Sequence, residues 1–444
     1  MITYSIIKKS QLESSNRLDA EYYQPEYLEV AEKLKNAPKI SELTSDIRYG
    51  LYVDPEYKNE GVGFVRATNL LNFWIDEEIF KIDEKNVPID YRLKIGDSLI
   101  VRSGANTGSV GLIYSELENA TFGSYTIRLR FNKINPFFAS IFLNCKYGVL
   151  QTQKLQTGMA QPNLNIPNIK EIKIPIISED RQKEVENFCI KIEKTNKDSE
   201  NLYSQAENLL LEELGLRDFD EKAGLWNIVN LSEVKEVGRI DAEYFQPKYE
   251  KLISKIKSKN PQTLETFIRT HSTGFPFQSE NYQETGIPLI RINNIQKGYL
   301  DLSNSAYLSE KDYLLSPKDI AKSGDIVLSM SGSIGMTALV PKDIPKSIIN
   351  QRILRITPQN IEKDYLVLLL NSIVGSYQLE RIGTGGLQTN ISYKDIKNIL
   401  IPVLSKPIQQ KISKLIQKSH EARKKAKELL EEAKHKVEEL IESK

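Results

Sequence analysis

The chain has 444 residues, of which 40% are hydrophobic and 27% are charged, and its formal net charge is +1 at pH 7. This length predicts two to four globular domains, and the near-zero charge excludes a free-standing, strongly basic DNA-binding protein while leaving local basic patches open. No apolar run reaches about 18 residues and the N-terminus lacks the features of a signal peptide, so we expect no membrane partner and a cytoplasmic location.

Cysteine and histidine usage argues against disulfide and metal chemistry. Cys145 and Cys189 are too few for a disulfide framework, so we expect reduced thiols. His271, His420 and His435 are scattered, and no Cys or His spacing matches a zinc or iron site. We therefore expect no metal site.

The first distinctive element in chain order is the phrase RLDAEYYQPEY at residues 17–27, which returns as RIDAEYFQPKY at residues 239–249. Eight of the eleven positions are identical. Asp19 and Asp241 are candidate helix caps, and a short amphipathic helix is predicted after each phrase. We interpret the phrase as a structural clasp, with docking of a partner protein as the alternative. Its tyrosines are expected to bury their rings against two long helices described below and to satisfy their hydroxyls locally: Tyr22, Tyr27, Tyr244 and Tyr249.

Short β-type runs follow each phrase, separated by Gly, Asn, Asp and Ser. The predicted strands lie within residues 63–67, 98–103, 109–114 and 125–131 of the first half, and 287–292, 325–330, 337–340 and 352–356 of the second. A helix near residues 136–147 interrupts the β pattern. Each half therefore predicts a mixed α/β domain with an irregular, loop-rich sheet.

A long helix is predicted after each α/β half, because residues 178–214 and 406–444 are rich in helix formers and contain apolar positions spaced four and three apart. We expect the two helices to form an antiparallel coiled coil, with packing of each helix on its own domain as the alternative. The predicted division is residues 1–177 and 215–404 for the domains, and 178–214 and 405–444 for the helices.

The two halves match in order well beyond the opening phrase, which indicates two copies of one domain. Residues 61–70 match 286–295, and residues 157–175 match 384–402 with nine identities in nineteen positions. A rigid helical spacer of roughly 20–25 residues would hold the domains about 30–38 Å apart, near one turn of B-DNA. This arrangement suggests a reader of two half-sites on one duplex.

At this point the sequence resembles type I restriction–modification specificity subunits. The resemblance rests on the repeated DAEY-aromatic-QP phrase, the G-x-x-x-x-R-x-x-N stretch, the GD-loop-SG hairpin, and the T-G-x-x-Q-x-N…I-x-IP segment before a Q-containing long helix. It covers nearly the whole chain in both copies. The helix openings depart from the commonest form, in which Pro precedes Glu-Gln; here they read EDRQ (179–182) and KPIQ (406–409).

The resemblance implies that each α/β copy is a target recognition domain and that the subunit binds a split, asymmetric DNA sequence. It further implies docking of two methyltransferase subunits, which use S-adenosylmethionine to methylate adenine, and of restriction/translocase subunits. The chain itself would perform no chemistry and bind no cofactor.

The residues also give no support for catalysis. NPFF at 135–138 lacks the second proline of an adenine-methyltransferase loop and aligns with EKDY in the second copy, so Asn135 is read as a helix cap and Pro136 as the first turn. No dinucleotide-binding or phosphate-binding glycine motif is present.

Candidate DNA contacts are side chains with paired hydrogen-bonding groups, or polar groups beside glycine-rich loops. The matched candidates are Arg66 and Asn69 with Arg291 and Asn294; Arg102, Ser103 and Asn106 with Ser331 and Ser333; and Gln161 and Asn163 with Gln388 and Asn390. Because the half-sites should differ in sequence, base readers are expected where the copies differ: Tyr52, Arg102 and Asn106 in the first copy, and His271, Gln278 and Ser333 in the second.

Several alternatives remain open from sequence alone. Arg66 and Arg291 fit a structural ion pair as well as a DNA contact, and the Gln161/Gln388 and Asn163/Asn390 pairs fit an ordered turn or a phosphate contact better than base reading. For the whole chain, the alternatives are a coiled-coil scaffold that binds no DNA, or the recognition subunit of another multi-subunit restriction system. An independent enzyme is the least supported.

Overall fold

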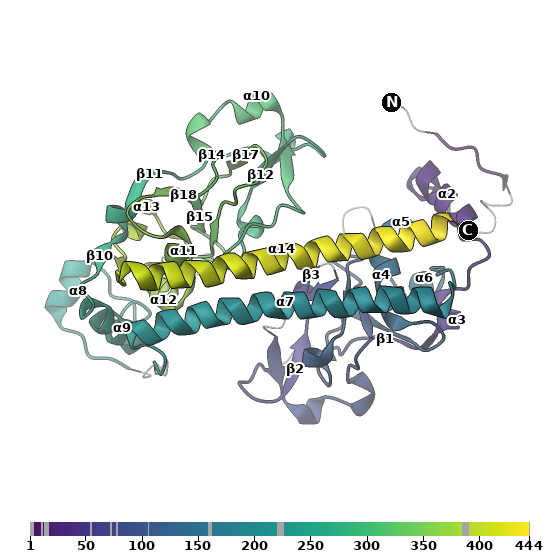
Figure 1. Cartoon of the computed structure of the whole chain (residues 1–444), viewed down its shortest axis with the longest axis horizontal. Helices are drawn as coiled ribbons and strands as arrows, with labels where there is room; N and C mark the ends of the chain where they lie inside the picture. Colours follow the sequence, from purple (N-terminus) through teal and green to yellow (C-terminus); the bar gives the residue numbers. More distant parts are fainter. Residues whose placement is uncertain are drawn as a thin grey trace. The chain divides into compact units, whose positions relative to one another are not determined.

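The structure is a computed structural model of the whole chain (Figure 1). It describes residues 4–9, 12, 17–53, 56–71, 73–76, 79–104, 106–158, 162–219, 226–383 and 390–443, apart from the side chain of Glu116. The chain divides into two compact units, Met1–Asn196 with Lys424–Lys444, and Lys197–Arg423. The unit boundaries lie within the two long helices.

The first unit contains an antiparallel sheet in the order β1-β9-β6-β7, a mixed sheet in the order β5-β2-β8, and the β3-β4 pair. Its strands are β1 Thr44–Tyr49, β2 Val62–Val65, β3 Leu70–Leu71, β4 Trp74–Ile75, β5 Phe80–Ile82, β6 Ser98–Val101, β7 Val110–Leu112, β8 Thr121–Phe122 and β9 Thr126–Phe131. Its shorter α-helices are α2 Pro25–Lys33, α3 Ile40–Leu43, α4 Pro136–Asn144, α5 Lys146–Leu155 and α6 Ile166–Lys170.

The second unit contains sheets in the orders β11-β18-β15-β16, β13-β12-β17-β14 and β10-β19. Its strands are β10 Gln262–Thr263, β11 Ile268–Ser272, β12 Ile287–Ile290, β13 Ala306–Leu308, β14 Ile320–Ala321, β15 Ile326–Ser329, β16 Thr337–Leu339, β17 Ser347–Ile349, β18 Ile353–Pro358 and β19 Leu400–Ile401. Its shorter α-helices are α8 Leu231–Val237, α9 Pro247–Lys257, α10 Glu310–Tyr313, α11 Lys363–Asn371, α12 Ile373–Ile382 and α13 Tyr393–Ile396.

The four-stranded antiparallel sheet and three strands of the mixed sheet have the same order in both units, which confirms the mixed α/β class and the internal duplication. The order β1-β9-β6-β7 has its counterpart in β11-β18-β15-β16, and β5-β2-β8 in β13-β12-β17. In both units the pair formed by β2 and β8, or β12 and β17, is parallel. The interior strands β6 (SLIV) and β15 (IVLS) are buried along their whole length, as a continuous apolar run between two neighbours requires.

The long helices are α7 Glu179–Leu214 and α14 Lys406–Glu442 (Figure 1). In the first unit Lys436 of α14 pairs with Glu184 of α7 at 3.3 Å, and in the second Ser199 of α7 contacts Ser419 of α14. The residue numbers run in opposite directions along the two helices, so the predicted antiparallel pairing is confirmed.

The helix pair also forms part of each domain core, so the two packing alternatives coexist. In the first unit Val185 and Ile192 of α7 and Val437 of α14 join a buried cluster that includes sheet and α4 residues. In the second unit Leu210 of α7 and Ile412 of α14 join the equivalent cluster. Each long helix therefore buries a stripe wider than a coiled-coil seam, as expected for a helix that packs on two neighbours.

The start of each long helix is fixed to the α/β domain by a buried glutamine. Gln182 accepts a hydrogen bond from the backbone N–H of Asn135 (2.8 Å) and donates one to the carbonyl of Ile177 (2.8 Å). Gln409 does the same with Glu362 (3.2 Å) and Leu404 (2.8 Å). The Q of the EDRQ and KPIQ openings thus holds the helix on its own domain.

The segment NPFF is a helix start, as predicted. The Asn135 side-chain oxygen accepts hydrogen bonds from the backbone N–H groups of Phe137 (2.9 Å) and Phe138 (3.2 Å), and Pro136 is the first residue of α4. These are the donors that a helix N-terminus leaves without an intrahelical partner.

The opening phrase forms the same clasp in both units. Arg17 pairs with Asp19 at 2.5 Å and covers the Tyr22 ring, and Arg239 pairs with Asp241 at 2.6 Å and covers the Tyr244 ring. Neither aspartate makes the predicted side-chain helix cap, because its carboxylate binds the arginine instead.

The expected packing of the clasp tyrosines on the long helices needs correction for Tyr22 and Tyr249, whereas Tyr27 packs against the cluster that includes α7 and α14 residues. The Tyr22 ring lies beneath Lys154 of α5, and the Tyr249 ring packs on Tyr377 of α12. The helices after the phrase contact α5 and α12 in the same way. The clasp therefore closes each domain on its own short helix.

Both cysteines are buried and free. Burial raises the pKa of the Cys145 thiol to about 12 and also raises the pKa of the Cys189 thiol. The expectation of reduced thiols agrees with this packing, because a buried neutral thiol is unreactive.

Candidate nucleic-acid interface

Three loops meet at the same place in each unit: the 3₁₀ turn after β2 or β12, the β6–β7 or β15–β16 hairpin, and the segment after β8 or β17. The hairpin is joined to the third loop by a backbone hydrogen bond, from Arg102 N to Tyr125 O (2.9 Å) in the first unit. In the second unit the bond runs from Met330 N to Arg352 O (2.8 Å). The frame of the site is thus duplicated residue by residue.

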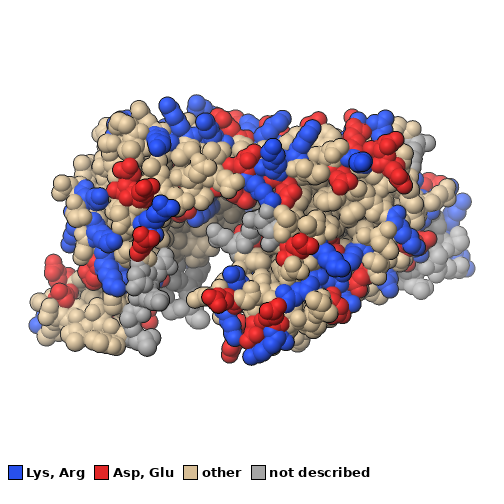
Figure 2. All heavy atoms as spheres, turned by 60° about the horizontal axis from the view of Figure 1, so that its bottom comes forward, with Lys and Arg blue, Asp and Glu red and all other residues tan. Residues whose placement is uncertain are grey.

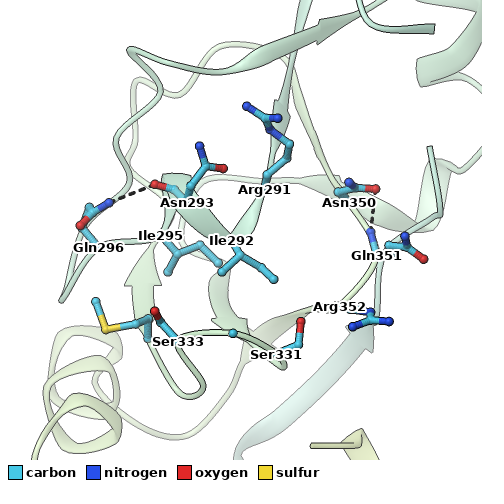
Figure 3. A pocket seen from close by; sticks show the side chains of 12 residues that line it. Arg291, Ile292, Asn293, Ile295, Gln296, Ser331, Ser333, Asn350, Gln351 and Arg352 are labelled. Atoms are coloured by element: carbon cyan, nitrogen blue, oxygen red, sulfur yellow. Dashed lines mark hydrogen bonds between the residues drawn. The ribbon is translucent and has the colours of Figure 1, made fainter. Parts of the chain in front are cut away.

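In the second unit these loops enclose a pocket of about 600 Å³. Figure 3 shows Ile292 and Ile295 near its centre, with polar side chains around them. The polar lining residues are Arg291, Asn293, Gln296, Ser331, Ser333, Asn350, Gln351 and Arg352. An apolar floor with a rim of hydrogen-bonding groups suits a planar, polar-edged ligand such as a base.

The matched arginines of the 3₁₀ turn lie over aromatic rings. The Arg66 guanidinium lies 4.4 Å from the centre of the Phe80 ring, and that of Arg291 lies 5.8 Å from the Tyr282 ring. Within the described residues neither forms an ion pair, and the buried Nε of each has no hydrogen-bond partner. The structural ion pair considered from the sequence is therefore wrong. Arg291 Nη2 donates to the carbonyl of Asn304 (3.2 Å), and the Nε of each arginine is left as a donor for a ligand.

Asn69 and Asn294 require a correction as candidate DNA contacts. They are 3% and 1% exposed, and the side-chain oxygen of each accepts a hydrogen bond at 2.9 Å from the backbone N–H of the arginine three residues earlier. The Asn294 amide also donates to the carbonyl of Asp301 (2.9 Å). Both side chains are committed to the shape of the loop and do not face a ligand.

A second contact is present in both units, between a serine of the hairpin and an asparagine that follows α5 or α12. Ser103 is bridged to Asn163, and Ser331 to Asn390, through backbone pairing. Ser331 is 1% exposed, and its hydroxyl lines the pocket without a partner in the described structure. Their neighbours Gln161 and Gln388 lie outside the described residues.

Like Arg66, Arg102 lies over an aromatic ring and has an Nε without a hydrogen-bond partner among the described residues. Its guanidinium lies 4.9 Å from the centre of the Tyr49 ring. The side chain is partly exposed at the hairpin, beside Ser103. Asn106, at the tip of the same hairpin, is exposed.

The remaining candidates are exposed but lie outside the pocket lining. Tyr52 is 93% exposed, and Gln278 is exposed in the loop that precedes β12. His271 lies in β11 and stacks on Tyr393 at 3.6 Å between ring centres. Burial, followed by the nearby charge of Arg355, lowers the pKa of His271, which disfavours a charged contact with a phosphate.

Sequence reasoning missed the third loop. Gln351 and Arg352 are exposed at the pocket, and Tyr125, which matches Arg352, is 63% exposed. The rule that base readers lie where the copies differ applies to this loop, because its sequence is GSY (123–125) in the first copy and NQR (350–352) in the second. The predicted strands at 125–131 and 352–356 begin at Tyr125 and Arg352, so the strand pattern hides this loop.

Figure 2 shows lysine and arginine side chains interspersed with aspartate and glutamate over the visible face. This agrees with the net charge of +1. On this face, contacts with nucleic acid would depend on particular side chains rather than on a broad positive field.

A family model of the type I restriction modification DNA specificity domain matches residues 29–208 and 260–434. The two matches repeat the duplication seen in the fold and together cover most of the chain. This chain belongs to the type I restriction–modification DNA specificity family. Its function within that family is DNA target recognition.

Curated relatives carry the same description. The chain is 25% identical over 391 residues to the type I restriction enzyme MjaVIII specificity subunit of Methanocaldococcus jannaschii, covering 84% of each protein. It is 28% identical over 134 residues to the type I restriction enzyme EcoBI specificity subunit of Escherichia coli, covering 30% of this chain and 28% of that protein.

Among solved structures, the specificity subunit from M. genitalium matches with a TM-score of 0.37 and 15% identity, covering 91% of this chain and 94% of that one. The HsdS subunit from Thermoanaerobacter tengcongensis matches with a TM-score of 0.29 and 14% identity, covering 91% and 95%. In the part of the chain that the structure describes, no helix is long and apolar enough to cross a membrane.

Proposed function

We propose that this specificity-family chain is a non-catalytic subunit that recognises a bipartite, asymmetric DNA target, with one half-site read by each unit. The observation that carries the proposal is the duplicated loop cluster, in which an equivalent backbone frame presents different side chains. Two equivalent frames suit one kind of ligand, and different side chains suit different base sequences.

The chain's own contribution is recognition. Arg66 and Arg291 occupy equivalent positions in both units, which favours a contact common to both half-sites, such as a phosphate. The hairpin and the third loop differ between the units, which favours base reading. The gap between half-sites would be set by the helices α7 and α14.

The chemistry is assigned to partners. We propose two methyltransferase subunits, which bind S-adenosylmethionine, and restriction/translocase subunits, with no cofactor held by this chain. The complex would act on double-stranded DNA in the cytoplasm. The duplicated domains support one methyltransferase for each half-site.

The test is a map of methylated adenines in DNA from cells that express this chain with its methyltransferase. We expect a split motif with a fixed gap, and loss of that methylation when the loop clusters of either unit are replaced by glycine–serine loops. A stable complex that adds no sequence-specific methylation would contradict the proposal and favour the scaffold alternative.

A further inference from the structure

In each unit, the hairpin and the third loop are joined by one backbone hydrogen bond, and one of the two bonded residues is an arginine. The arginine is the donor residue in the first unit and the acceptor residue in the second. The paired residues are Arg102 and Tyr125 in the first unit, and Met330 and Arg352 in the second. The guanidinium comes from the hairpin in one unit and from the third loop in the other. Each unit therefore presents one copy-specific arginine from an otherwise equivalent frame.

Arg352 has an uncommon backbone conformation and a side chain that is held by one hydrogen bond. Its backbone is left-handed, with a φ of +66°, which is uncommon for a residue with a Cβ and is concentrated at functional sites. Its Nη1 donates to the side-chain oxygen of Asn390 at 3.2 Å. The side chain is otherwise exposed at the pocket rim, and Figure 3 shows it facing the same hollow as Ser331.

The surroundings supply further unused donors. The Ser331 hydroxyl and the Arg291 Nε are buried at the pocket without a hydrogen-bond partner among the described residues. Buried polar groups normally have partners, so these groups indicate a ligand with acceptor atoms. In the first unit the Arg102 Nε, beside the Tyr49 ring, is also buried without a hydrogen-bond partner among the described residues.

A guanidinium can make two parallel hydrogen bonds, and guanine presents two adjacent acceptors, O6 and N7, in the major groove. A phosphate would also accept from arginine, but a phosphate contact carries no sequence information and would suit a residue shared by both copies. Arg102 and Arg352 are not shared, so base reading fits them better.

We propose that each recognition unit reads a guanine with its copy-specific arginine: Arg352, positioned by Asn390, in the second half-site, and Arg102 in the first. This inference rests on the proposed function of the chain. It names the base and the side chain that the proposed function leaves open.

The test is selection from a duplex DNA library with two randomised half-sites, using the complex of this chain with its methyltransferase. The variants are Arg352→Gly and Arg102→Met. Glycine adopts the left-handed backbone without strain, and methionine is the residue that the other copy has at the matching position.

Each variant is the other's internal control. We expect Arg352→Gly to lose about 5- to 100-fold of the preference for guanine at one position of one half-site, and to leave the other half-site unchanged. Arg102→Met should do the reverse. Arg269→Ala, which removes an exposed arginine of β11 outside the pocket lining, should leave both half-sites unchanged.

Arg352→Lys covers the case in which the glycine variant fails to fold or to bind the methyltransferase. Lysine keeps the charge but not the two-bond fork, so guanine preference should fall while total binding at low salt persists. Full guanine preference in Arg352→Lys would overturn the inference.

Three other outcomes would overturn it in distinguishable ways. An unaltered motif with folded Arg352→Gly and Arg102→Met would reject base reading by these arginines and leave the proposed function intact. Equal weakening for all sequences would assign them to phosphates. A wild-type complex without any sequence preference would reject the proposed function itself, and this inference with it.

Discussion

At the scale of single residues, comparing the two copies distinguishes side chains that maintain the loops from side chains that are available for a ligand. Asn69 and Asn294 are shared, buried and fully engaged with backbone groups. Arg102 and Arg352 are specific to one copy and retain free donors or an exposed guanidinium. Identity between the copies therefore marks structure at some positions and a common ligand at others, and burial distinguishes the two cases.

The first prediction concerns Asn294. Replacement by alanine should destabilise the second unit by about 1–3 kcal/mol, because a backbone donor and a backbone acceptor lose their partners in a buried loop. Denaturant unfolding measures this change. Asn293→Ala is the matched control, since Asn293 is exposed, and should change the free energy of unfolding by less than about 0.5 kcal/mol. Equal effects of the two substitutions would contradict the assignment.

The second prediction concerns Arg291. Arg291→Met should weaken DNA binding by the complex to a similar degree for all sequences and lower the slope of log affinity against log salt by about 1. Titrations of specific and non-specific duplexes at several salt concentrations check this. A change in the recognised motif would instead make Arg291 a base reader.

At the scale of elements, the sequence predicted the strands that carry a buried apolar run and missed strands that are polar or very short. β6, β7, β9, β15 and β16 lie within the predicted runs, and β18 extends two residues beyond the run predicted at 352–356. β1 (TSDIRY) is an edge strand with polar, partly exposed residues, so it has no apolar run to detect. β8 and β14 have two residues each, too few for any periodicity.

The candidate site could be predicted only in part, because part of it lies in an exposed loop that has no recognisable sequence pattern. The rule that base readers lie where the copies differ pointed to the hairpin around Arg102. It did not reach Arg352, because the exposed loop before β18 was absorbed into the strand reading, and the left-handed backbone at that residue has no sequence signature when the residue is not glycine or asparagine.

The third prediction concerns helix α14. Burial, followed by the nearby charge of Arg423, lowers the pKa of His420 from 6.5 to about 4, and its Nε2 has no partner among the described residues. Between these two pKa values the unfolded chain binds the proton and the folded chain does not. Stability should therefore fall as the pH drops from about 6.5 to 4, by on the order of 3 kcal/mol.

His420→Gln tests this effect, because glutamine does not titrate. Its free energy of unfolding should depend less on pH over that interval than that of the wild type. His435→Gln, at an exposed position of the same helix, should keep the wild-type dependence. The same pH dependence in His420→Gln and wild type would show that other groups are responsible.

At the scale of the whole molecule, the unit boundaries lie after Asn196 in α7 and after Arg423 in α14. These are equivalent positions of the repeat, at the same offset as the match between residues 157–175 and 384–402. Near them, in the second unit, the hydroxyls of Ser199 and Ser419 each donate to the other residue's backbone carbonyl, at 2.8 and 2.7 Å. The small serines allow close approach and fix the register of the helix pair there.

The fourth prediction follows from the net charge of +1. The chain alone should bind DNA weakly, because a net charge near zero gives little overall attraction to phosphates, and tightly only with its methyltransferase. Fluorescence anisotropy with and without that partner measures the difference at one fixed salt concentration. Equal affinities would show that this chain supplies the full DNA grip itself.

The backbone pair that carries Arg102 in one unit and Arg352 in the other also bears on how such a protein changes over generations. The frame is maintained by buried groups such as Asn69 and Asn294, while the arginine occupies either side of one hydrogen-bonded pair. Moving the guanidinium across that pair leaves the backbone pairing in place. If these arginines read the base as proposed, a lineage would acquire a new target through a few codon changes at this pair, without passing through an unfolded ancestor.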